Sequence, residues 1–414
     1  MQTTRFNLFI LNRDLYMQNT SRLFWVAFLS TCLGIGLFRF SYTSLMPLLV
    51  EQKWFTASFA SYLSSANLLG YLIGALLAHP ASRYIQDRKL IIINAFVGSL
   101  SLLLCAIQGL PEFLYIVFRL FSGIAGATLM VLAPSYALRR VAPEIRQKLS
   151  MVAFSGIGAG VVISTFIVPY AAQINVGLGW LFLGILSLVF SLLIFIGLLD
   201  QQARTVTNYS YEPTVSLQSK QIQMVVLVIA AYALSAIAYI PHSLFWIDFI
   251  KSELHQTIHF ANQQWAFYGI GSMLGAGFAF YCVKHWQLAG ALWRCYLLYS
   301  LAIFIPVYLH SFYSLALSSF LTGLLNPAVV SLSSSALLTI LGAQHHQSAW
   351  SMATAAFATA QLLGGLFMSF LHTHHIDYTN LFFLGAIIMS VGFVCSTCFY
   401  IIQKVNLTQF KGKN

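Results

Sequence analysis

Charged side chains are scarce in this chain of 414 residues. Asp, Glu, Lys and Arg together make up 7% of it, whereas hydrophobic residues make up 59% and the mean hydropathy is +0.79. A soluble domain carries about a quarter charged residues and under half apolar ones. The composition excludes a soluble globule, a disordered chain and a coiled coil, and the strand-like alternation of a barrel is missing. We therefore expect an all-α integral membrane protein.

Several functional motifs are missing as well. Acidic residues number 10 against 21 basic ones, but no stretch is basic enough to follow a phosphate backbone, so nucleic acid is excluded as a partner. There is no Gly-x-x-x-x-Gly-Lys-Ser/Thr loop, which excludes ATP as the energy source. No paired acids or catalytic triad share a depth, so neither an enzyme nor a cofactor is expected. The six cysteines all fall inside apolar runs, which argues against a disulfide framework.

Apolar runs of membrane-crossing length are abundant. A helix crosses the hydrocarbon layer in about 20 residues and satisfies its own backbone polar groups. The apolar stretch before the first long run is too short for a signal peptide, so we expect no cleavage. Twelve runs meet the requirement, at residues 23–50, 58–79, 90–110, 113–138, 149–172, 178–199, 221–247, 263–283, 288–309, 311–341, 348–371 and 380–403.

The basic residues are distributed unevenly over the connections between these runs. Sixteen Lys and Arg lie in the terminal segments and alternate loops of one face, whereas the opposite face has only Lys53 and Lys251. Because basic loops stay in the cytoplasm, both termini are predicted to be cytoplasmic, in a protein of the bacterial inner membrane. The predicted units are a cytoplasmic segment 1–22, a six-helix bundle 23–199, a cytoplasmic central loop 200–220, a second six-helix bundle 221–403 and a cytoplasmic tail 404–414.

The two bundles share weak sequence matches at an offset near 200 residues. Arg119-Leu-Phe-Ser-Gly123 corresponds to Ser319-Phe-Leu-Thr-Gly323, and Met151 corresponds to Met352. Several matches at nearly one offset favour a duplicated six-helix unit. Transporters built in this way have two halves that rock around a site near the membrane midplane.

Short motifs resemble those of a known family. Arg119-x-x-x-Gly123 is similar to the Arg-x-x-x-Gly signature of the major facilitator superfamily, and Gly156-x-Gly158-x-Gly160 is similar to its antiporter-type glycine motif. The loop 82–89 keeps Arg88-Lys89 but lacks the glycine-containing core of the family's loop motif, which argues against a gating latch there.

More narrowly, the chain resembles the YbfB/YjiJ group of that superfamily over nearly its whole length. The resemblance implies the fold of the superfamily, with 12 transmembrane helices in two pseudo-symmetric six-helix bundles. It also implies a transporter whose first, fourth, seventh and tenth spans line a central cavity, but it supplies no substrate. The matching stretches are Arg39-Phe-Ser-Tyr42-Thr43-Ser-Leu-Met-Pro47, Tyr62-Leu-Ser-Ser-Ala-Asn67-Leu-Leu-Gly70-Tyr71-Leu-x-Gly74 and Met352-Ala-Thr-Ala-Ala-Phe357-x-x-x-Gln361-Leu-Leu-Gly364.

Two arginines lie deep within the predicted spans. Arg39 is about 16 Å and Arg119 about 10 Å from the outer end of its span, on a rise of about 1.5 Å per residue. The carboxylates lie in loops or tails, except Asp248 at the outer end of a span. A central cavity that contains arginines and few carboxylates suits an anionic substrate, because Arg presents a bidentate fork to carboxylate or phosphate. Two alternatives stay open: Arg119 bonds backbone carbonyls of neighbouring helices, and Arg39 snorkels to the outer surface or pairs with Asp248.

Polar residues on the presumed lining spans complete the predicted site, although a helix–helix hydrogen bond explains each uncharged one equally well. A histidine side chain can titrate near physiological pH, so His242 is a candidate for proton coupling together with Asp248, the carboxylate nearest the cavity mouth. His372-x-His374-His375 with Asp377 has metal-ligand residue types, but the spacing fits no standard closed zinc site, and no metal is predicted. The predicted substrate-binding residues are Arg39, Tyr42, Asn67, Arg119, Tyr239, His242, Asn326 and Gln361.

Two functions remain in competition. The leading hypothesis is a monomeric secondary transporter that moves a small organic anion through the lipid bilayer by alternating access, with protons as the candidate coupling ion. The alternative is a polyspecific proton-coupled efflux pump for lipophilic or cationic compounds, which 34 Phe, 20 Tyr and 8 Trp favour. Those aromatics could equally form interfacial belts, and a cation pump usually needs a carboxylate within the membrane.

Overall fold

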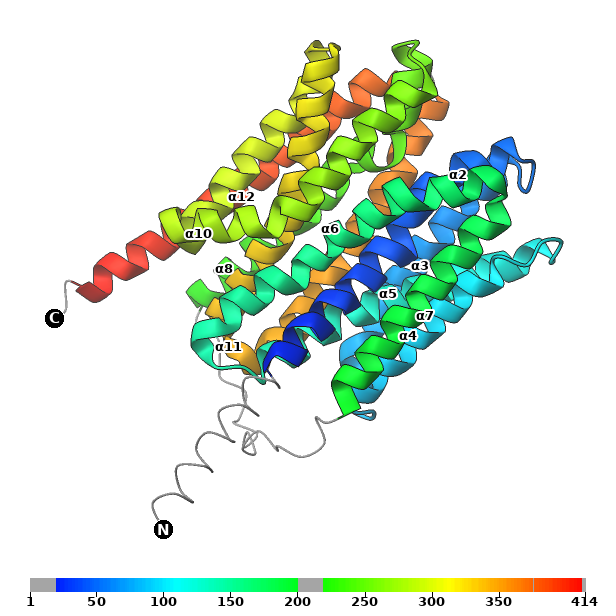
Figure 1. Ribbon diagram of the computed structural model, residues 1–414. Helices are drawn as coiled ribbons and strands as arrows, with labels where there is room; N and C mark the ends of the chain where they lie inside the picture. Colours follow the sequence, from blue (N-terminus) through cyan, green and yellow to red (C-terminus); the bar gives the residue numbers. More distant parts are fainter. Residues whose placement is uncertain (1–19, 200–218, 375, 412–414) are drawn as a thin grey trace, which may run out of the picture.

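The computed structural model describes residues 20–199, 219–374 and 376–411, and in these residues every regular element is a helix (Figure 1). The first span is one continuous run, made of a helix over residues 20–31, the π-helix η1 (Cys32–Phe40) and α2 (Ser41–Glu51). The other elements are α3 (Ala57–Ala81), α4 (Asp87–Leu104), α5 (Glu112–Leu138), α6 (Pro143–Ile174), α7 (Val176–Leu199), α8 (Ser219–Ala238), η2 (Pro241–Phe245), α9 (Trp246–Asp248), η3 (Phe249–Glu253), α10 (Ile258–Tyr308), α11 (Phe312–Thr373) and α12 (Tyr378–Lys411).

The helices account for the twelve predicted spans. Eight helical runs in the described residues are long and apolar enough to cross a membrane. Two of them, α10 and α11, each hold two predicted spans, because the backbone bends at Gln287 (φ 57°, ψ 170°) and at Gly342 (φ 75°, ψ 169°) where loops were expected. Both arms of these helices, together with α3 and α4, bring the total to twelve. The third span is shorter than predicted, since α4 ends at Leu104.

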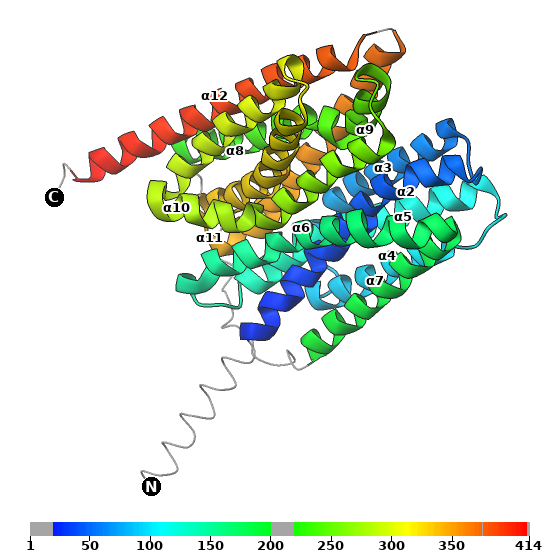
Figure 2. The ribbon, with the colours of Figure 1, turned by 45° about the horizontal axis from the view of Figure 1, so that its top comes forward.

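The described residues form two halves, the N-half (residues 20–199) and the C-half (residues 219–411). Across their interface α3 packs against α11 and α6 against α10. The α4 and α7 helices lie at one outer edge of the molecule and α12 lies at the opposite edge (Figure 2). Large apolar side chains such as Leu181, Ile196 and Val391 stay exposed on these helices, as a surface that faces lipid requires.

The two halves repeat each other at the start of their second spans. Thr56 and Thr257 cap α3 and α10 in the same way, each accepting a hydrogen bond of 3.2 Å from the backbone N–H three residues further on. Shortly before these caps, Lys53 (φ 57°) and His255 (φ 52°) both adopt the left-handed conformation. The same turn and the same cap recur at an offset of about 200 residues, as the duplicated unit predicts.

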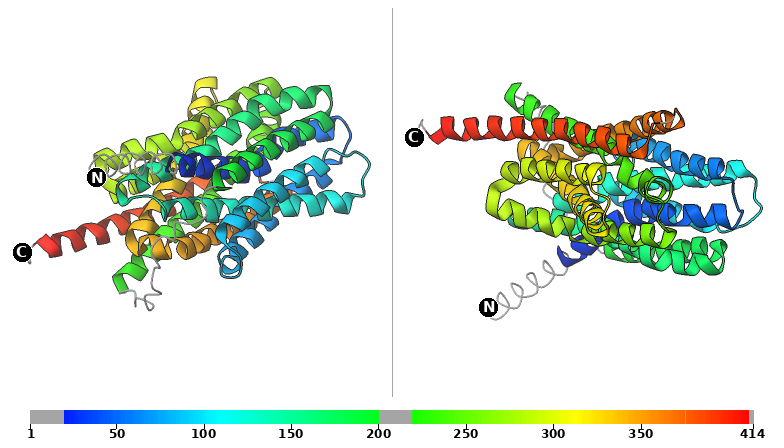
Figure 3. Two further views of the ribbon diagram at one scale, coloured as in Figure 1. Left: turned by 60° about the horizontal axis from the view of Figure 1, so that its bottom comes forward. Right: turned by 90° about the horizontal axis from the view of Figure 1, so that it is seen from above.

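Small residues bring the halves into close contact. A Cβ added to Gly158 of α6 would lie 2.1 Å from the backbone oxygen of Ser272 in α10, so only glycine fits there. Each half has its own apolar core, and the core of the C-half continues across the interface to Phe40, Tyr71 and Met130 of the N-half. One end of the molecule carries the connection between α3 and α4 and the bend of α11, and we call it the basic end. Figure 3 gives two further views of the helices.

Candidate functional site

Two cavities lie between the halves, and each draws residues from both. The empty space measures about 340 Å³ at the central cavity and about 380 Å³ at the adjacent cavity, including the part open to solvent. Arg39 and Phe40 line both of them. The central cavity is lined by Ile35, Arg39, Phe40, Tyr71, Met130, Ile157, Tyr232, Tyr239, Asn326, Pro327, Val330 and Phe357. The adjacent cavity is lined by Arg39, Phe40, Thr43, Ser64, Asn67, Leu68, Arg119, Ser243, Leu244 and Gln361.

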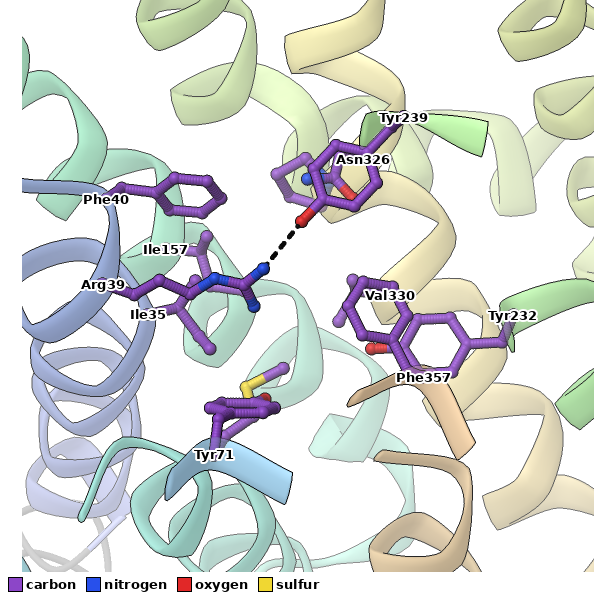
Figure 4. A pocket seen from close by; sticks show the side chains of 12 residues that line it. Ile35, Arg39, Phe40, Tyr71, Ile157, Tyr232, Tyr239, Asn326, Val330 and Phe357 are labelled. Carbon is purple, nitrogen blue, oxygen red and sulfur yellow. Dashed lines mark hydrogen bonds between the residues drawn. The ribbon is translucent and has the colours of Figure 1, made fainter. Parts of the chain in front are cut away.

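The half-buried side chain of Arg39 extends into the central cavity (Figure 4). Its Nη2 donates a hydrogen bond of 3.1 Å to the hydroxyl oxygen of Tyr239, which belongs to the opposite half. Its guanidinium carbon lies 5.5 Å from the ring centre of Phe40 and 5.6 Å from that of Tyr71. No carboxylate lies within ion-pair distance of Arg39 in the part of the chain that the structure describes. The charge of Arg39 therefore meets neutral partners, and the pairing with Asp248 considered from the sequence does not form.

The π-helical backbone of η1 positions this arginine. An added Cβ on Gly34 would lie 2.6 Å from the backbone oxygen of Gly126 in α5, and one on Gly36 would lie 2.4 Å from the Cα of Gly160 in α6. The first span is therefore wedged against two neighbours at glycine contacts just before Arg39. A π-helix changes the angular register of the residues that follow it and is frequent at functional sites. The tight contacts and the altered register together direct Arg39 toward the C-half.

The hydroxyl of Tyr239 joins Arg39 to Gln361. Tyr239 accepts the bond from Arg39 and a second, short hydrogen bond from the amide nitrogen of Gln361. Since a hydroxyl has one proton and two acceptor lone pairs, its proton stays available in this arrangement. If the amide is turned over, Tyr239 donates to Gln361 and the amide N–H groups are free instead. Either way the pair can offer a donor to a bound molecule, and Asn326, which donates to Tyr268 at 3.0 Å, lies beside it.

Arg119 lies in a different environment from Arg39. Its side chain is 1% exposed, and its Nη1 donates a hydrogen bond of 3.0 Å to the backbone oxygen of Phe38 in η1. The guanidinium carbon lies 4.6 Å from the ring centre of Tyr42 and 5.9 Å from that of Trp180. This geometry agrees with the structural alternative for Arg119, a bond to a backbone carbonyl of a neighbouring helix. Arg119 nevertheless contributes to the wall of the adjacent cavity.

Two other predicted site residues belong to this packing. Asn67 donates through its side-chain nitrogen to the backbone oxygen of Phe38 at 3.2 Å and to Ser122 at 2.9 Å, and it also lines the adjacent cavity. Tyr42 donates to the backbone oxygen of Ala60 at 2.7 Å and lines neither cavity. Asn67 and Arg119 therefore hold the wall of the site, while Tyr42 supports Arg119 from behind.

The two candidates for proton coupling lie apart from both cavities. His242 is buried in the C-half, where its Nε2 is 2.9 Å from the hydroxyl of Ser318 and its ring stacks on Trp246 at 4.6 Å. Asp248 is exposed at the end of α9. Among the described residues no group of three or more His, Cys, Asp or Glu side chains could hold a metal ion, and His375 of the histidine-rich segment lies outside them.

Aromatic residues that the sequence reasoning missed form much of the central cavity. Tyr232 stacks on Phe357 with ring centres 4.6 Å apart, and Phe357 lies 6.2 Å from Tyr239. On its other side Tyr232 stacks on Trp350 at 5.4 Å. We call these four rings the aromatic column. A signal was present, because Phe357 lies four residues before Gln361 on one face of α11, and Tyr232 lies two helical turns before Tyr239.

The aromatic column ends near a group of contacts that closes the basic end. Trp350 donates from its indole nitrogen to the backbone oxygen of Met130 across the interface at 3.3 Å. His346 stacks on Trp350 and lies between the hydroxyls of Ser135 in the N-half, at 3.3 Å, and Ser334 in the C-half, at 2.9 Å. These contacts tie α5 to the second arm of α11.

Charged and polar side chains at the surface extend this closure. Arg139 pairs with Asp87 at the start of α4 and also donates to the side-chain oxygen of Gln347 in α11. Gln347 in turn donates to the hydroxyl of Ser82 at 2.9 Å. The loop 82–89 thus contacts the C-half through Ser82 and, by way of Arg139, through Asp87, although it lacks the glycine-containing core. The expectation that this loop holds no gating latch stays a prediction. We call Ser82, Asp87, Arg139, His346, Gln347 and Trp350 the basic-end lock.

Comparison with known proteins agrees with this architecture. The model of a family described as "Uncharacterised MFS-type transporter YbfB" matches residues 31–397, which cover most of both halves and every residue that lines the two cavities. The chain belongs to this family. No match was found among the curated proteins. The resemblance and the predicted fold are thereby confirmed, and the protein is a membrane transporter of the major facilitator superfamily with its cavities between the two bundles, where such transporters hold their substrate.

Proposed function

We propose that this transporter carries a small organic anion across the inner membrane by alternating access. The observation that supports this proposal is the environment of Arg39. Its guanidinium lies at the interface of the halves, directed into the central cavity, with neutral partners only among the described residues. An ionised group in such a place is costly unless it is paired. An anionic substrate offsets this cost, and a cationic one increases it.

The donors around Arg39 suit a carboxylate. A guanidinium can donate two parallel bonds to one carboxylate group, and the pair formed by Tyr239 and Gln361 can add a further donor. The substrate would compete with Tyr239 for Arg39, the bond that joins the halves at the cavity. Substrate binding would therefore change the contact between the halves at the point where they move.

Alternating access requires that one end be closed while the other opens. The basic-end lock joins the halves through the hydrogen bonds of Trp350, His346, Arg139 and Gln347. We infer that these residues separate in the opposite state, and that this end faces the cytoplasm because the basic loops lie there. The two moving units correspond to bundles 23–199 and 221–403, and a single chain holds the whole site.

The efflux pump for lipophilic cations is the second candidate. The aromatic rings of Tyr71, Tyr232 and Phe357 favour it, because such faces attract cations. The positive charge of Arg39 in the same cavity opposes it more strongly, since none of the described carboxylates pairs with Arg39. Proton coupling through His242 or Asp248 stays a prediction, because neither residue lines a cavity.

Counterflow in proteoliposomes tests the proposal without knowledge of the driving ion. Vesicles holding the purified protein and unlabelled benzoate, hexanoate or succinate would be diluted into a trace of the same labelled anion. We expect transient accumulation of at least one labelled anion, its loss in Arg39→Gln, and its retention in Arg294→Gln. Arg294 is a matched control, since it contacts Trp286 and Trp293 away from both cavities.

The competing function predicts a different result in the same vesicles. Accumulation of tetraphenylphosphonium, with none of the three anions, would favour the cation pump. Anion counterflow that survives in Arg39→Gln would remove Arg39 from the site and with it the basis of the proposal.

A further inference from the structure

The shape of the central cavity carries the substrate assignment further. We propose that the transported anion is an aromatic carboxylate, with its carboxylate on Arg39 and a single flat ring against the aromatic column. This inference rests on the proposed function, because it assigns the body of the anion whose charged group Arg39 binds.

Flat apolar faces flank the guanidinium on the N-half side. The rings of Phe40 and Tyr71 lie at nearly equal distances from the guanidinium carbon, 5.5 Å and 5.6 Å. A carboxylate bound to Arg39 would therefore lie between the rings of Phe40 and Tyr71 at the N-half wall of the cavity (Figure 4). The body of the ligand must lie beyond this point, toward the C-half.

The opposite wall is a set of stacked rings. Phe357 and Tyr232 are nearly parallel, with an interplanar angle of 29°, and Tyr239 is tilted by 31° from Phe357. Both faces of Tyr232 are covered, by Phe357 and by Trp350, so Tyr232 bounds the cavity with the edge of its ring. Aromatic pairs gain about 0.5–1.5 kcal/mol beyond their area burial when offset-stacked or edge-to-face, corresponding to about 2- to 13-fold in affinity. An aromatic ligand can place the face of its ring against this edge, whereas a saturated ring offers no such face.

The size of the cavity limits the ligand to a small one. Its empty space is about 340 Å³ even when the part open to solvent is counted, so only a small ligand can lie there. The aliphatic residues Ile157 and Val330 and the side chain of Met130 bound it further. A molecule with one ring and one carboxylate fits this space better than a fused polycyclic one.

The direct test compares an anion with an aromatic ring and an anion with the corresponding saturated ring. Benzoate and cyclohexanecarboxylate have the same carbon skeleton and charge, so the ratio of their dissociation constants isolates the ring. The purified full-length transporter in nanodiscs would be titrated with each, and with the uncharged benzamide. We expect benzoate to bind about fivefold more tightly than cyclohexanecarboxylate, and benzamide to bind too weakly to compete.

Two leucine variants on one helix provide the matched pair. Phe357→Leu removes one ring of the aromatic column, and we expect the ratio to fall to within about twofold. Phe367→Leu makes the same change ten residues further along α11 at an exposed position and should keep the ratio. A variant that changes the population of the binding-competent state changes both dissociation constants by the same factor, because both ligands bind that state. The ratio of the two dissociation constants therefore stays the same. If Phe357→Leu does not fold, Tyr232→Leu gives the same reading.

The outcomes separate the two proposals. Equal affinities of the two carboxylates, both lost in Arg39→Gln, would overturn the aromatic assignment and leave the anion transporter in place. A preference for benzoate that persists equally in Phe357→Leu and Tyr232→Leu would also overturn it. If neither carboxylate binds while hexanoate or succinate shows counterflow, the aromatic assignment fails and the anion transporter stands. If Arg39→Gln binds both carboxylates as tightly as the native protein, the proposed function itself fails.

Discussion

Arg39 and Arg119 are expected to respond oppositely when each is changed to glutamine. Arg119 is fully buried and bonded to the backbone of η1, whereas Arg39 is half buried with one hydrogen bond to a neutral hydroxyl. We expect Arg119→Gln to reduce the stability of the ligand-free protein and to leave anion affinity within about threefold of the native value. We expect Arg39→Gln to preserve stability and to abolish most of the affinity.

The contacts give the magnitudes. A hydrogen bond from a charged group is worth about 1.5–3 kcal/mol, and a desolvated cation–π contact such as that of Arg119 with Tyr42 is worth about 2 kcal/mol. Because Asn67 still donates to Phe38, we expect a loss of about 2–4 kcal/mol for Arg119→Gln. At Arg39 the lost contacts to Phe40 and Tyr71 are offset by relief of an unpaired charge, so the net change should stay within about 1 kcal/mol.

The affinity change follows from the same values. Removal of the charge at Arg39 loses at least one charged hydrogen bond to the carboxylate, which corresponds to about 10- to 150-fold weaker binding of benzoate. Thermal unfolding in nanodiscs, with and without benzoate, measures both quantities on the same samples. The reasoning is refuted if Arg39→Gln melts as early as Arg119→Gln and still gains the native stabilisation from benzoate.

Three further changes probe the movement and the coupling. Trp350→Leu removes the hydrogen bond to Met130 from the basic-end lock. Because the halves then separate more easily at this end, we expect a higher rate of benzoate exchange in the counterflow assay. Gly158→Ala places a Cβ 2.1 Å from the backbone oxygen of Ser272, so we expect loss of transport or of folding, seen by counterflow and size-exclusion chromatography. His242→Asn should leave counterflow intact; if it also leaves uptake driven by a pH gradient intact, His242 is not the proton carrier.

The fold could be predicted from the sequence because the features that determine it are short segments of the chain. Span length, the bias of Lys and Arg, and the small residues at helix contacts can each be recognised along the chain. The offset of about 200 residues reappears in three dimensions at Thr56 and Thr257. The bends at Gln287 and Gly342 also fall where loops were expected, although the helices continue through them.

The site was harder to predict, because depth in the membrane does not fix the direction of a side chain. Arg39 and Arg119 were both expected deep within their spans, yet Arg39 extends toward the cavity from the π-helix η1, whereas Arg119 bonds to the backbone of η1 itself. His242 was expected in the cavity and instead bonds Ser318 within the C-half. The aromatic column was missed since Tyr232 and Phe357 look like ordinary core residues until the helices are placed.

The position of Trp350 also gives the protein an optical reporter of its own state. Its indole is fully buried, stacked on Tyr232 and bonded to the opposite half. Separation of the halves at this end would expose the ring to water and shift its emission to longer wavelength. In a variant that keeps Trp350 and has phenylalanine at the other tryptophans, the emission wavelength of Trp350 would report whether the basic end is open or closed, without any attached dye.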